Sequence, residues 1–463
     1  MNAITAVELD AYDDVGMERL RKFVETATGG VIVEMERQVR WRPSWYAKLL
    51  KDGRTEQIYL RGDRTGDAAI FPDLKREADI LGILERHGIP VPHVYGYCAD
   101  PPCIVMETLP GTRDMASEED AVARAAIGQE YIRAIAAMHD LPLDPFVEAG
   151  VNRPSSPEEI ALVGISAYMP LYRRTKAKAE PLLEFAIGWM RRNVPANRTD
   201  ARFVQFDCGQ FLFDKGRLTG LYDFEFAMIA DPMMDLATMF MREAVEPLGS
   251  PFEELCEEYA RASGKAVDMR VVLFHTLQFA TLGTMQFAGT VARGIAGDPH
   301  SIYLEWDISL REVIVIALSK LMGQSLPNVP ALEACNGEQA GLIAKINDTL
   351  SSLKGAEPID QSYKEQLQAM LSLLARVDSV GPAARDLDRK EIGALLGADF
   401  ADFAEAEQAL ETHILQAPPE EDAALFQMLA SMHARQFQIA APTAIAKSAH
   451  EVTRRQSAAW AGI

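Results

Sequence analysis

The chain has 463 residues, which is typical of about three compact units and too long for a single small binding module. Hydrophobic residues make up 48% and charged residues 24%, an ordinary globular composition with no bias toward disorder or coiled coil. The formal net charge is −21. This surplus of acids argues against nucleic acid or an anionic membrane as the main partner, although it leaves room for a local basic pocket.

The cysteines and the apolar segments indicate a cytoplasmic protein. The first ten residues lack the basic and then apolar stretch of a secretory signal. The longest apolar stretch, residues 271–292, contains His275, Gln278 and Gln286, which predicts a helix buried in protein rather than one that spans lipid. We expect reduced thiols, because no CxxC pair or metal-ligand spacing occurs among the five cysteines, Cys98, Cys103, Cys208, Cys256 and Cys335.

The first predicted elements in chain order are strands. Residues 45–50 alternate in character, Asp52-Gly53 is a typical hairpin turn, and residues 57–61 resume the alternation. The only glycine-rich turn nearby is Gly29-Gly30. A helix is predicted after Pro72-Asp73, where the apolar period changes.

This strand and helix contain one basic and one acidic residue at unusual positions. In the second strand Ile58 and Leu60 share one face, so Arg61 lies on the other. Glu77 falls on the apolar stripe of the following helix and therefore points toward the interior. A buried carboxylate needs a cationic partner, so we predict that Glu77 pairs with Arg61.

The rest of the chain is mainly helical. Strand-like segments at 94–97 and 103–106 complete a β-rich region that ends at Pro110-Gly111. Helical periodicity then runs from about residue 118 to residue 323, interrupted by one β segment at 203–222, and Ser325–Pro330 is a predicted linker. The C-terminal region is predicted to form helices at 342–353, 363–377, 403–415 and 422–436.

The β segment carries the residues with the clearest chemistry. A short strand ends at Asp207, and a hairpin with its turn at residues 214–217 follows. In this hairpin Gln210 would pair near Leu221, so the fold would bring Asp207, Gln210 and Asp223 to one end of the ribbon.

Phosphoryl transfer requires such a set, namely an acid that deprotonates the attacking hydroxyl and oxygen ligands for magnesium. From the spacing alone, polar turn residues beside an ordinary hairpin are the simpler interpretation. Asp231-Pro232 predicts a helix start. Asp235, one turn inside, could complement the helix dipole or brace the preceding loop by hydrogen bonds.

The ordered series of motifs resembles the aminoglycoside phosphotransferase and choline kinase-like family. That family has a His-Gly-Asp loop, an Asn a few residues later, a hairpin, Asp-Trp-Glu, and an Asp-Pro-x-x-Asp-Leu-Ala helix start. The corresponding segments here are Gln205-Phe206-Asp207, Gln210, Asp223-Phe224-Glu225 and residues 231–237. Upstream, Arg61, Glu77, the 88–92 turn, the 105–111 segment and the helix end at Ala136-Ala137-Met138-His139 also match, so that the resemblance covers about residues 20 to 323.

The resemblance implies an α+β, two-lobed protein-kinase-like fold with a β-rich N-lobe at 1–110 and a helical C-lobe at 111–323. An extra all-α region at 331–463 lies beyond it. The implied activity is the transfer of the γ-phosphate of ATP, or GTP, to a hydroxyl of a small molecule. Asp207 would be the catalytic acid/base, and Gln210 and Asp223 would hold Mg²⁺. Arg61, oriented by Glu77, would contact phosphates, and the hinge residues Glu107 and Leu109 would hold the base.

This chain also departs from the family pattern. Gln205-Phe206 replaces His-Gly, and the loop from Asp207 to the metal ligand is two residues shorter. The alternative reading is therefore a catalytically silent nucleotide-binding protein whose C-terminal helices mediate protein interaction, and a homodimer through those helices is also open. A protein kinase is disfavoured because no Ala-Pro-Glu end follows Asp223.

Other catalytic and binding sites find little support in the sequence. No GxxxxGKS/T motif occurs, since Tyr259 stands where the first glycine would precede Ser263-Gly264-Lys265. The histidines, including His139 at a predicted helix end, are interpreted as surface or capping residues. The acceptor could be an aminoglycoside, a choline-like molecule or a hydroxyacyl thioester. A thioester would favour a basic patch at 173–176 or 191–192, where solvated helix charge is the simpler interpretation.

Overall fold

The computed structural model describes residues 11–38, 42–63, 73–243, 246–294, 300–354 and 358–451. The chain divides into two compact units, which are considered separately. Unit 1 comprises residues 1–160 and 198–267, and unit 2 comprises residues 161–197 and 268–463. The domain boundaries predicted from the sequence lie elsewhere, near residue 110 and between residues 323 and 331. They remain predictions.

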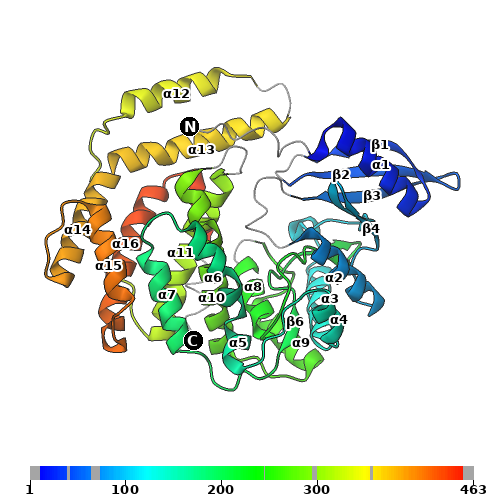
Figure 1. The fold of residues 1–463 in the computed structure, drawn as a ribbon, viewed down its shortest axis with the longest axis horizontal. Coiled ribbons are helices and arrows are strands. Elements are labelled where there is room, and N and C mark those ends of the chain that lie inside the picture. Colours follow the sequence, from blue (N-terminus) through cyan, green and yellow to red (C-terminus); the bar gives the residue numbers. More distant parts are fainter. Residues whose placement is uncertain are drawn as a thin grey trace. The chain divides into compact units, whose positions relative to one another are not determined.

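Unit 1 contains a five-stranded antiparallel sheet in the order β1-β2-β3-β5-β4 (Figure 1). The predicted hairpin is confirmed, because Lys51 pairs with Arg54 across a turn in which Asp52 and Gly53 have φ of 49° and 75°. Such positive angles favour glycine and match the twist of the two strands. The strands span Val31–Arg37 (β1), Ser44–Lys51 (β2), Arg54–Gly62 (β3), Val94–Ala99 (β4) and Pro102–Glu107 (β5).

Two helices flank this sheet. Helix α1 (Asp14–Thr28) packs Leu20 and Val24 into a core formed with the inward faces of β2 and β3, which include Ile58 and Leu60. Helix α2 (Leu74–Arg86) lies against β4 and β5. In the glycine-rich turn, Gly29 is the left-handed C-cap of α1 and precedes the first strand. Pro72 lies outside the described residues.

The remainder of unit 1 is helical with two small ribbons. Strand β6 (Arg202–Val204) pairs with β9 (Met228–Ala230), and β7 (Phe211–Asp214) pairs with β8 (Arg217–Leu221). The second ribbon is the predicted hairpin, although Phe211 rather than Gln210 is opposite Leu221. The helices are η2 (Met115–Ser117), α3 (Ala121–His139), α4 (Asp144–Glu148), α8 (Met233–Glu243) and α9 (Phe252–Ser263), with α5 (Pro157–Ala161) at the junction of the units.

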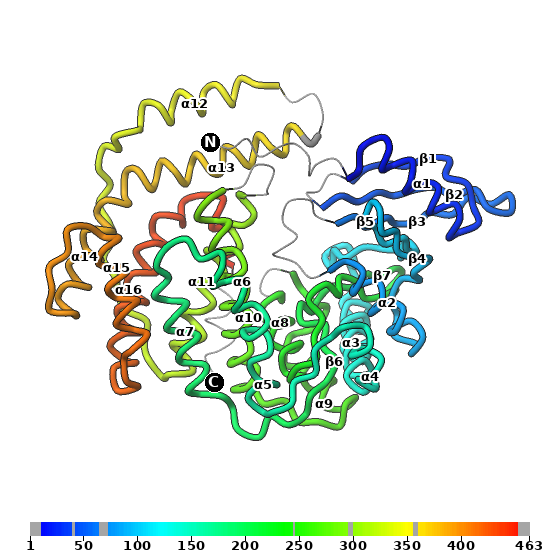
Figure 2. The backbone as a smooth tube through the Cα atoms, in the orientation of Figure 1, coloured from blue at the N-terminus to red at the C-terminus, as the bar shows by residue number. Residues whose placement is uncertain are grey.

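The secondary structure of unit 2 is helical, with no strand among its described residues (Figure 2). The four predicted C-terminal helices are confirmed as α12 (Ala340–Ser352), α13 (Pro358–Ser379), α15 (Phe403–Ile414) and α16 (Asp422–Ala440), together with the short η3 (Pro419–Glu421) and η4 (Ala444–Ala446). Helix α14 (Gly381–Leu396) is missing from the prediction. The other helices are α6 (Val163–Thr175), α7 (Pro181–Arg192), α10 (Met269–Arg293) and α11 (His300–Met322).

Helix α10 contains the long apolar stretch and is buried along most of its length, as predicted. Its polar side chains are hydrogen-bonded inside the unit; Gln278, for example, accepts a hydrogen bond from Gly164 N at 3.1 Å. Among the described residues, no helix is both long enough and apolar enough to cross a bilayer.

The C-terminal helices share a core with helices from the middle of the chain. Helix α16 packs on α11 and α15 packs on α7. Glu411 of α15 accepts hydrogen bonds from Lys176 Nζ and Glu180 N, each at 2.6 Å. His433 of α16 contacts Glu312 of α11 at 2.7 Å. The predicted linker has no helix or strand, and its Pro330 carbonyl accepts a hydrogen bond from Gln438.

Candidate active site

The first part of the site is the predicted ion pair between β3 and α2. Arg61 Nε lies 3.0 Å from Glu77 Oε2, and both side chains are buried. Arg61 Nη2 also lies 2.5 Å from Asp223 Oδ1 and 3.7 Å from Glu225 Oε2. The prediction that Arg61 partners Glu77 is confirmed, and the same guanidinium contacts two further carboxylates.

These three carboxylates form one compact cluster. Oxygen atoms of Glu77, Asp223 and Glu225 lie within 4.8 Å of one another. Glu77 Oε1 accepts a hydrogen bond from Phe224 N at 3.0 Å, which fixes the backbone beside Asp223. Burial raises the pKa of Glu77, with Arg61 opposing this effect and Asp223 and Glu225 adding to it. The cluster therefore concentrates negative charge that a cation would stabilise.

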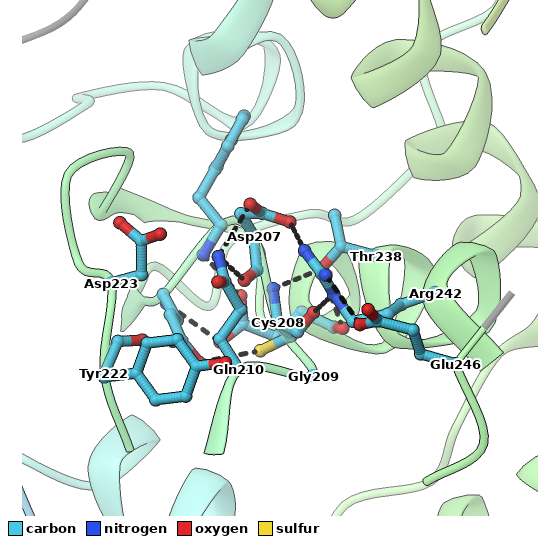
Figure 3. Close-up of polar contacts among 12 residues, drawn as sticks. Asp207, Cys208, Gly209, Gln210, Tyr222, Asp223, Thr238, Arg242 and Glu246 are labelled. Atoms are coloured by element: carbon cyan, nitrogen blue, oxygen red, sulfur yellow. Dashed lines mark hydrogen bonds and ion pairs between the residues drawn. The ribbon is translucent and has the colours of Figure 1, made fainter. Parts of the chain in front are cut away.

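The second part is the loop after β6 that carries Asp207 (Figure 3). Asp207 Oδ1 lies 2.6 Å from Arg242 Nη2, and Oδ2 accepts a hydrogen bond from Gln210 Nε2 at 2.8 Å. Burial raises the pKa of Asp207, Arg242 opposes this, and Asp223 adds to it. The electrostatic interaction of the two aspartates agrees with the expectation that the hairpin brings them to one end.

Two hydrogen bonds join this loop to the backbone of Tyr222, the residue before Asp223. Gln205 Nε2 donates to the Tyr222 carbonyl at 2.7 Å, and Tyr222 N donates to the Gln210 carbonyl at 3.1 Å. Asp223 has φ of 65°, a left-handed conformation that is costly for a residue other than glycine. Backbone strain of this kind is common at functional sites, where the surrounding contacts hold the residue in place. Gln210 touches Asp207 through its amide nitrogen, and the ligand role of its oxygen remains a prediction.

Asp235 of α8 holds this loop through hydrogen bonds with the loop backbone. Its carboxylate accepts hydrogen bonds from Gln205 N at 2.9 Å and Phe206 N at 2.8 Å. These contacts stabilise Phe206, which has φ of 70°. The predicted helix start is also present, since Asp231 Oδ1 caps Met233 N at 3.0 Å. The bracing role considered for Asp235 is thereby confirmed.

His139 does not lie at the surface, and that part of its interpretation is wrong. The residue is buried, with Nε2 2.9 Å from Asp235 Oδ2 and Nδ1 2.8 Å from the Tyr259 hydroxyl. It ends α3, as expected, but its ring faces the interior and orients the bracing carboxylate. The helix-end position alone could not reveal which way the ring points.

The predicted hinge lies where β5 ends. Glu107 N donates to the His93 carbonyl at 2.8 Å, which continues the pairing of β5 with the segment before β4. The side chain of Leu109 lies against Gly220 of β8, where an added Cβ would be 2.7 Å from Leu109 Cδ1. The roles of Glu107 and Leu109 in holding a base remain predictions.

Three charged residues of the site carry no role in the sequence prediction: Arg42, Glu225 and Arg242. Arg42 forms a buried ion pair with Glu225, and their distance in sequence leaves no local signal for it. Arg242 lies seven residues after Asp235, two turns along the same face of α8. That spacing is the signal that could have placed Arg242 beside the loop.

The basic segments in unit 2 are engaged in ion pairs. Arg173 Nη2 lies 2.8 Å from Glu184 Oε2, and Lys176 Nζ contacts both Glu184 at 2.8 Å and Glu411 at 2.6 Å. Arg192 contacts Asp422 at 2.6 Å. These contacts give the basic residues a structural role.

Residues 44–273 match the model of the family described as "Phosphotransferase enzyme family". This segment, just under half of the chain, is similar to that family. The matched residues include Arg61, Glu77, Asp207 and Asp223, whereas Arg42 lies just before the matched segment. No curated protein matches the sequence.

Three solved structures are similar to this chain. A provisionally named aminoglycoside phosphotransferase from Ralstonia eutropha aligns with a TM-score of 0.50 and 16% identity, over 67% of this chain and 99% of that one. A macrolide 2'-phosphotransferase from Brachybacterium faecium gives a TM-score of 0.45 at 17% identity, over 60% and 94% of the two chains. The complex of APH(4)-Ia with ADP and hygromycin B gives 0.44 at 13% identity, over 65% and 97%. The described residues form an α+β fold with a β-rich N-terminal part and additional C-terminal helices, and the Ralstonia eutropha structure shares this fold over 67% of the chain.

Proposed function

We propose that this phosphotransferase moves the γ-phosphoryl group of ATP or GTP to a hydroxyl of a small molecule. The observation that carries the proposal is the placement of Asp207 and Asp223 by one ribbon, with Asp223 in contact with the Arg61–Glu77 pair. An acid near the acceptor and a second acid beside a fixed cation are the parts that phosphoryl transfer needs.

In this proposal Asp207 orients the acceptor hydroxyl and takes its proton. Its raised pKa makes the carboxylate a better proton acceptor than a fully solvated aspartate. Arg61, held by Glu77, contacts the α- and β-phosphates, and its planar guanidinium suits their oxygens. The backbone of Glu107 and Leu109 holds the base by hydrogen bonds.

The residues present fit magnesium. Asp223 belongs to a compact cluster of carboxylate oxygens, and Gln210 adds an amide group next to it in the ribbon; oxygen ligands of this kind are what magnesium prefers. We assign Asp223 and Gln210 as the residues that would hold the ion. When bound, magnesium would neutralise charge on the nucleotide phosphates.

Replacement of Asp207 tests the proposal. Asp207→Asn removes the proton acceptor but keeps the shape of the side chain, so we expect turnover to fall by roughly 10²–10⁴-fold while nucleotide affinity stays near that of the unmodified chain. Turnover is measured as phosphate transfer from ATP and from GTP, with Mg²⁺, to a panel of aminoglycosides, macrolides, choline and hydroxyacyl thioesters, and as phosphate release to water.

Asp214→Asn is the matched control, since Asp214 lies at the far end of the same hairpin. It should leave transfer unchanged. Transfer by Asp207→Asn at the rate of this control would contradict the role of Asp207. Failure of the unmodified chain to bind either nucleotide would contradict the proposed function as a whole.

The silent nucleotide-binding reading has one observation in its favour. Both oxygens of Asp207 are engaged, one by Arg242 and one by Gln210. Nucleotide binding with magnesium, no transfer to any acceptor and no phosphate release would support that reading. The homodimer through the C-terminal helices and the cytoplasmic location remain predictions.

A further inference from the structure

Arg242 contacts the catalytic loop at two successive residues. Its Nη2 lies 2.6 Å from Asp207 Oδ1, and its Nε donates to the Cys208 carbonyl at 2.8 Å (Figure 3). One planar group thus holds the side chain of the proposed base and the backbone that follows it. Arg242 lies beyond the helix-start motif at residues 231–237 and has no role in the motifs described above.

The guanidinium is itself held in place. Its Nη1 lies 3.1 Å from Glu246 Oε2, and Glu246 also contacts Arg113. The stem of Arg242 packs on Gly209, where an added Cβ would lie 2.3 Å from Arg242 Cδ. Gly209 also has φ of 89°, so glycine serves both the turn and the close approach of the arginine.

Helix α8 anchors the same loop at two more points. Asp235 accepts hydrogen bonds from the Gln205 and Phe206 backbone, and Thr238 Oγ1 accepts one from Cys208 N at 3.1 Å. Asp235, Thr238 and Arg242 are spaced by three and then four residues, which places them on one face of the helix. Only Arg242 among them touches Asp207 itself.

We propose that Arg242 is a positioning residue for phosphoryl transfer, which fixes Asp207 so that its Oδ2 faces the acceptor hydroxyl. This inference rests on the proposed function. With Oδ1 held by Arg242, Oδ2 keeps a lone pair beyond its hydrogen bond from Gln210. In the step, the acceptor proton passes to Oδ2, the acceptor oxygen bonds to the γ-phosphorus, and the bond from that phosphorus to the bridging oxygen breaks to release the nucleoside diphosphate.

A positioning role makes a specific demand on the side chain at 242. Two hydrogen bonds in fixed directions, to Asp207 and to the Cys208 carbonyl, suit the planar guanidinium with its rigid set of donors. A lysine ammonium keeps the charge without that geometry. The chain therefore needs arginine here for orientation as well as for charge.

The test compares Arg242→Ala and Arg242→Lys with the unmodified chain, with Mg²⁺–ATP and Mg²⁺–GTP as probes and phosphate transfer or release as the readout. We expect Arg242→Ala to lower kcat by about 10²-fold, the cost of a displaced catalytic group, with the nucleotide KM changed by less than about threefold. Arg242→Lys should recover part of the loss. Arg19→Ala, which removes an exposed ion pair with Asp100, should keep kcat.

A double variant separates positioning from general destabilisation. If Arg242 acts through Asp207, adding Arg242→Ala to Asp207→Asn should lower kcat by less than about threefold, because groups that act as a unit are not additive. Full additive loss would overturn the positioning role. Should Arg242→Ala fail to fold, Arg242→Lys decides: a lower kcat at unchanged nucleotide KM supports the role, and the kcat of the unmodified chain overturns it.

The two proposals fail in different ways. An active unmodified chain whose Arg242→Ala variant keeps kcat contradicts the positioning role alone. An unmodified chain that neither releases nor transfers phosphate contradicts the proposed function, and the positioning role with it.

Discussion

Arg61 is the residue on which the charge balance of the site depends. Its guanidinium contacts Glu77 at 3.0 Å, Asp223 at 2.5 Å and Glu225 at 3.7 Å, and Arg42 adds a second cation at Glu225. A buried charge is costly unless it is paired. Three acids can therefore stay close together because two arginines offset them, which keeps oxygen atoms available for a cation.

Replacing Glu77 tests this balance. Glu77→Gln keeps an acceptor for Phe224 N but removes the ion pair with Arg61, which then has only Asp223 and Glu225. We expect unfolding free energy to fall by about 1–3 kcal/mol and the nucleotide KM to rise several-fold, since Arg61 would turn toward Asp223. Urea unfolding and initial-rate kinetics measure the two effects.

Asp79→Asn is the control for Glu77→Gln. Asp79 lies on the same helix and pairs with Lys75 at 2.5 Å, but at the surface, where an ion pair contributes about 0–1 kcal/mol. Equal effects of the two substitutions on stability and on KM would show that the buried pair has no special role.

At the scale of elements, the sequence analysis correctly predicted the turns and the helix cap that are determined by residues close together in the chain. The 45–61 hairpin, the hairpin at 211–221 and the cap at Asp231 follow from turn chemistry and alternation, and the structure contains all three. Glu77 is predicted to face the interior because it lies on the apolar stripe of its helix, and a buried acid needs a cationic partner. These features depend on residues close together in the chain.

The features that sequence reasoning missed depend on residues far apart or on side-chain direction. Strand β9 is three residues long and exists by pairing with β6, and the Arg42–Glu225 contact joins two distant segments. His139 faces Asp235 because of how α3 packs. Helix α14 follows α13 after a single residue, and Gly381-Pro382 at its start suggests a break rather than a helix.

Helix α14 also carries a buried acid that makes the stability of unit 2 depend on pH. Asp388 is fully buried and pairs with Arg435 of α16, while its Oδ2 has no hydrogen-bond partner among the described residues. Burial raises the pKa of Asp388 from 3.8 to about 6, although Arg435 opposes this effect. Between these values the folded chain binds more protons than the unfolded chain, so stability falls as pH rises.

We therefore expect Asp388→Asn to gain stability relative to the unmodified chain between pH 4 and pH 7. The upper bound is ~3 kcal/mol, taken from the shift of the pKa at about 1.4 kcal/mol per unit. Urea unfolding at several pH values measures the difference. Asp386→Asn is the control, because Asp386 is exposed and Lys390 and Arg389 lower its pKa, which gives a pH dependence of opposite direction. A difference between Asp388→Asn and the unmodified chain that is constant with pH would contradict the assignment.

At the scale of the whole molecule, the net charge of −21 says little about the site. Unit 1 pairs its clustered acids with arginines, and unit 2 places its basic residues in ion pairs with Glu184 and Glu411. Charges thus act through local pairs. The global surplus of acids does not distinguish a cationic acceptor from a neutral or an anionic one.

The contacts inside unit 2 predict that the C-terminal region cannot be removed without damage. Helices α15 and α16 pack on α7 and α11, and the contacts of Glu411 with Lys176 and of His433 with Glu312 are buried or partly buried. A chain that ends at residue 323 would expose the apolar faces of α7 and α11 and leave Lys176 and Glu312 without these partners. We expect lower soluble yield and a lower melting temperature than for the full chain, measured side by side by circular dichroism. A soluble 1–323 chain that melts at the same temperature and binds nucleotide with the same affinity would instead support the boundary predicted from the sequence, because the C-terminal helices would then fold as a separate domain.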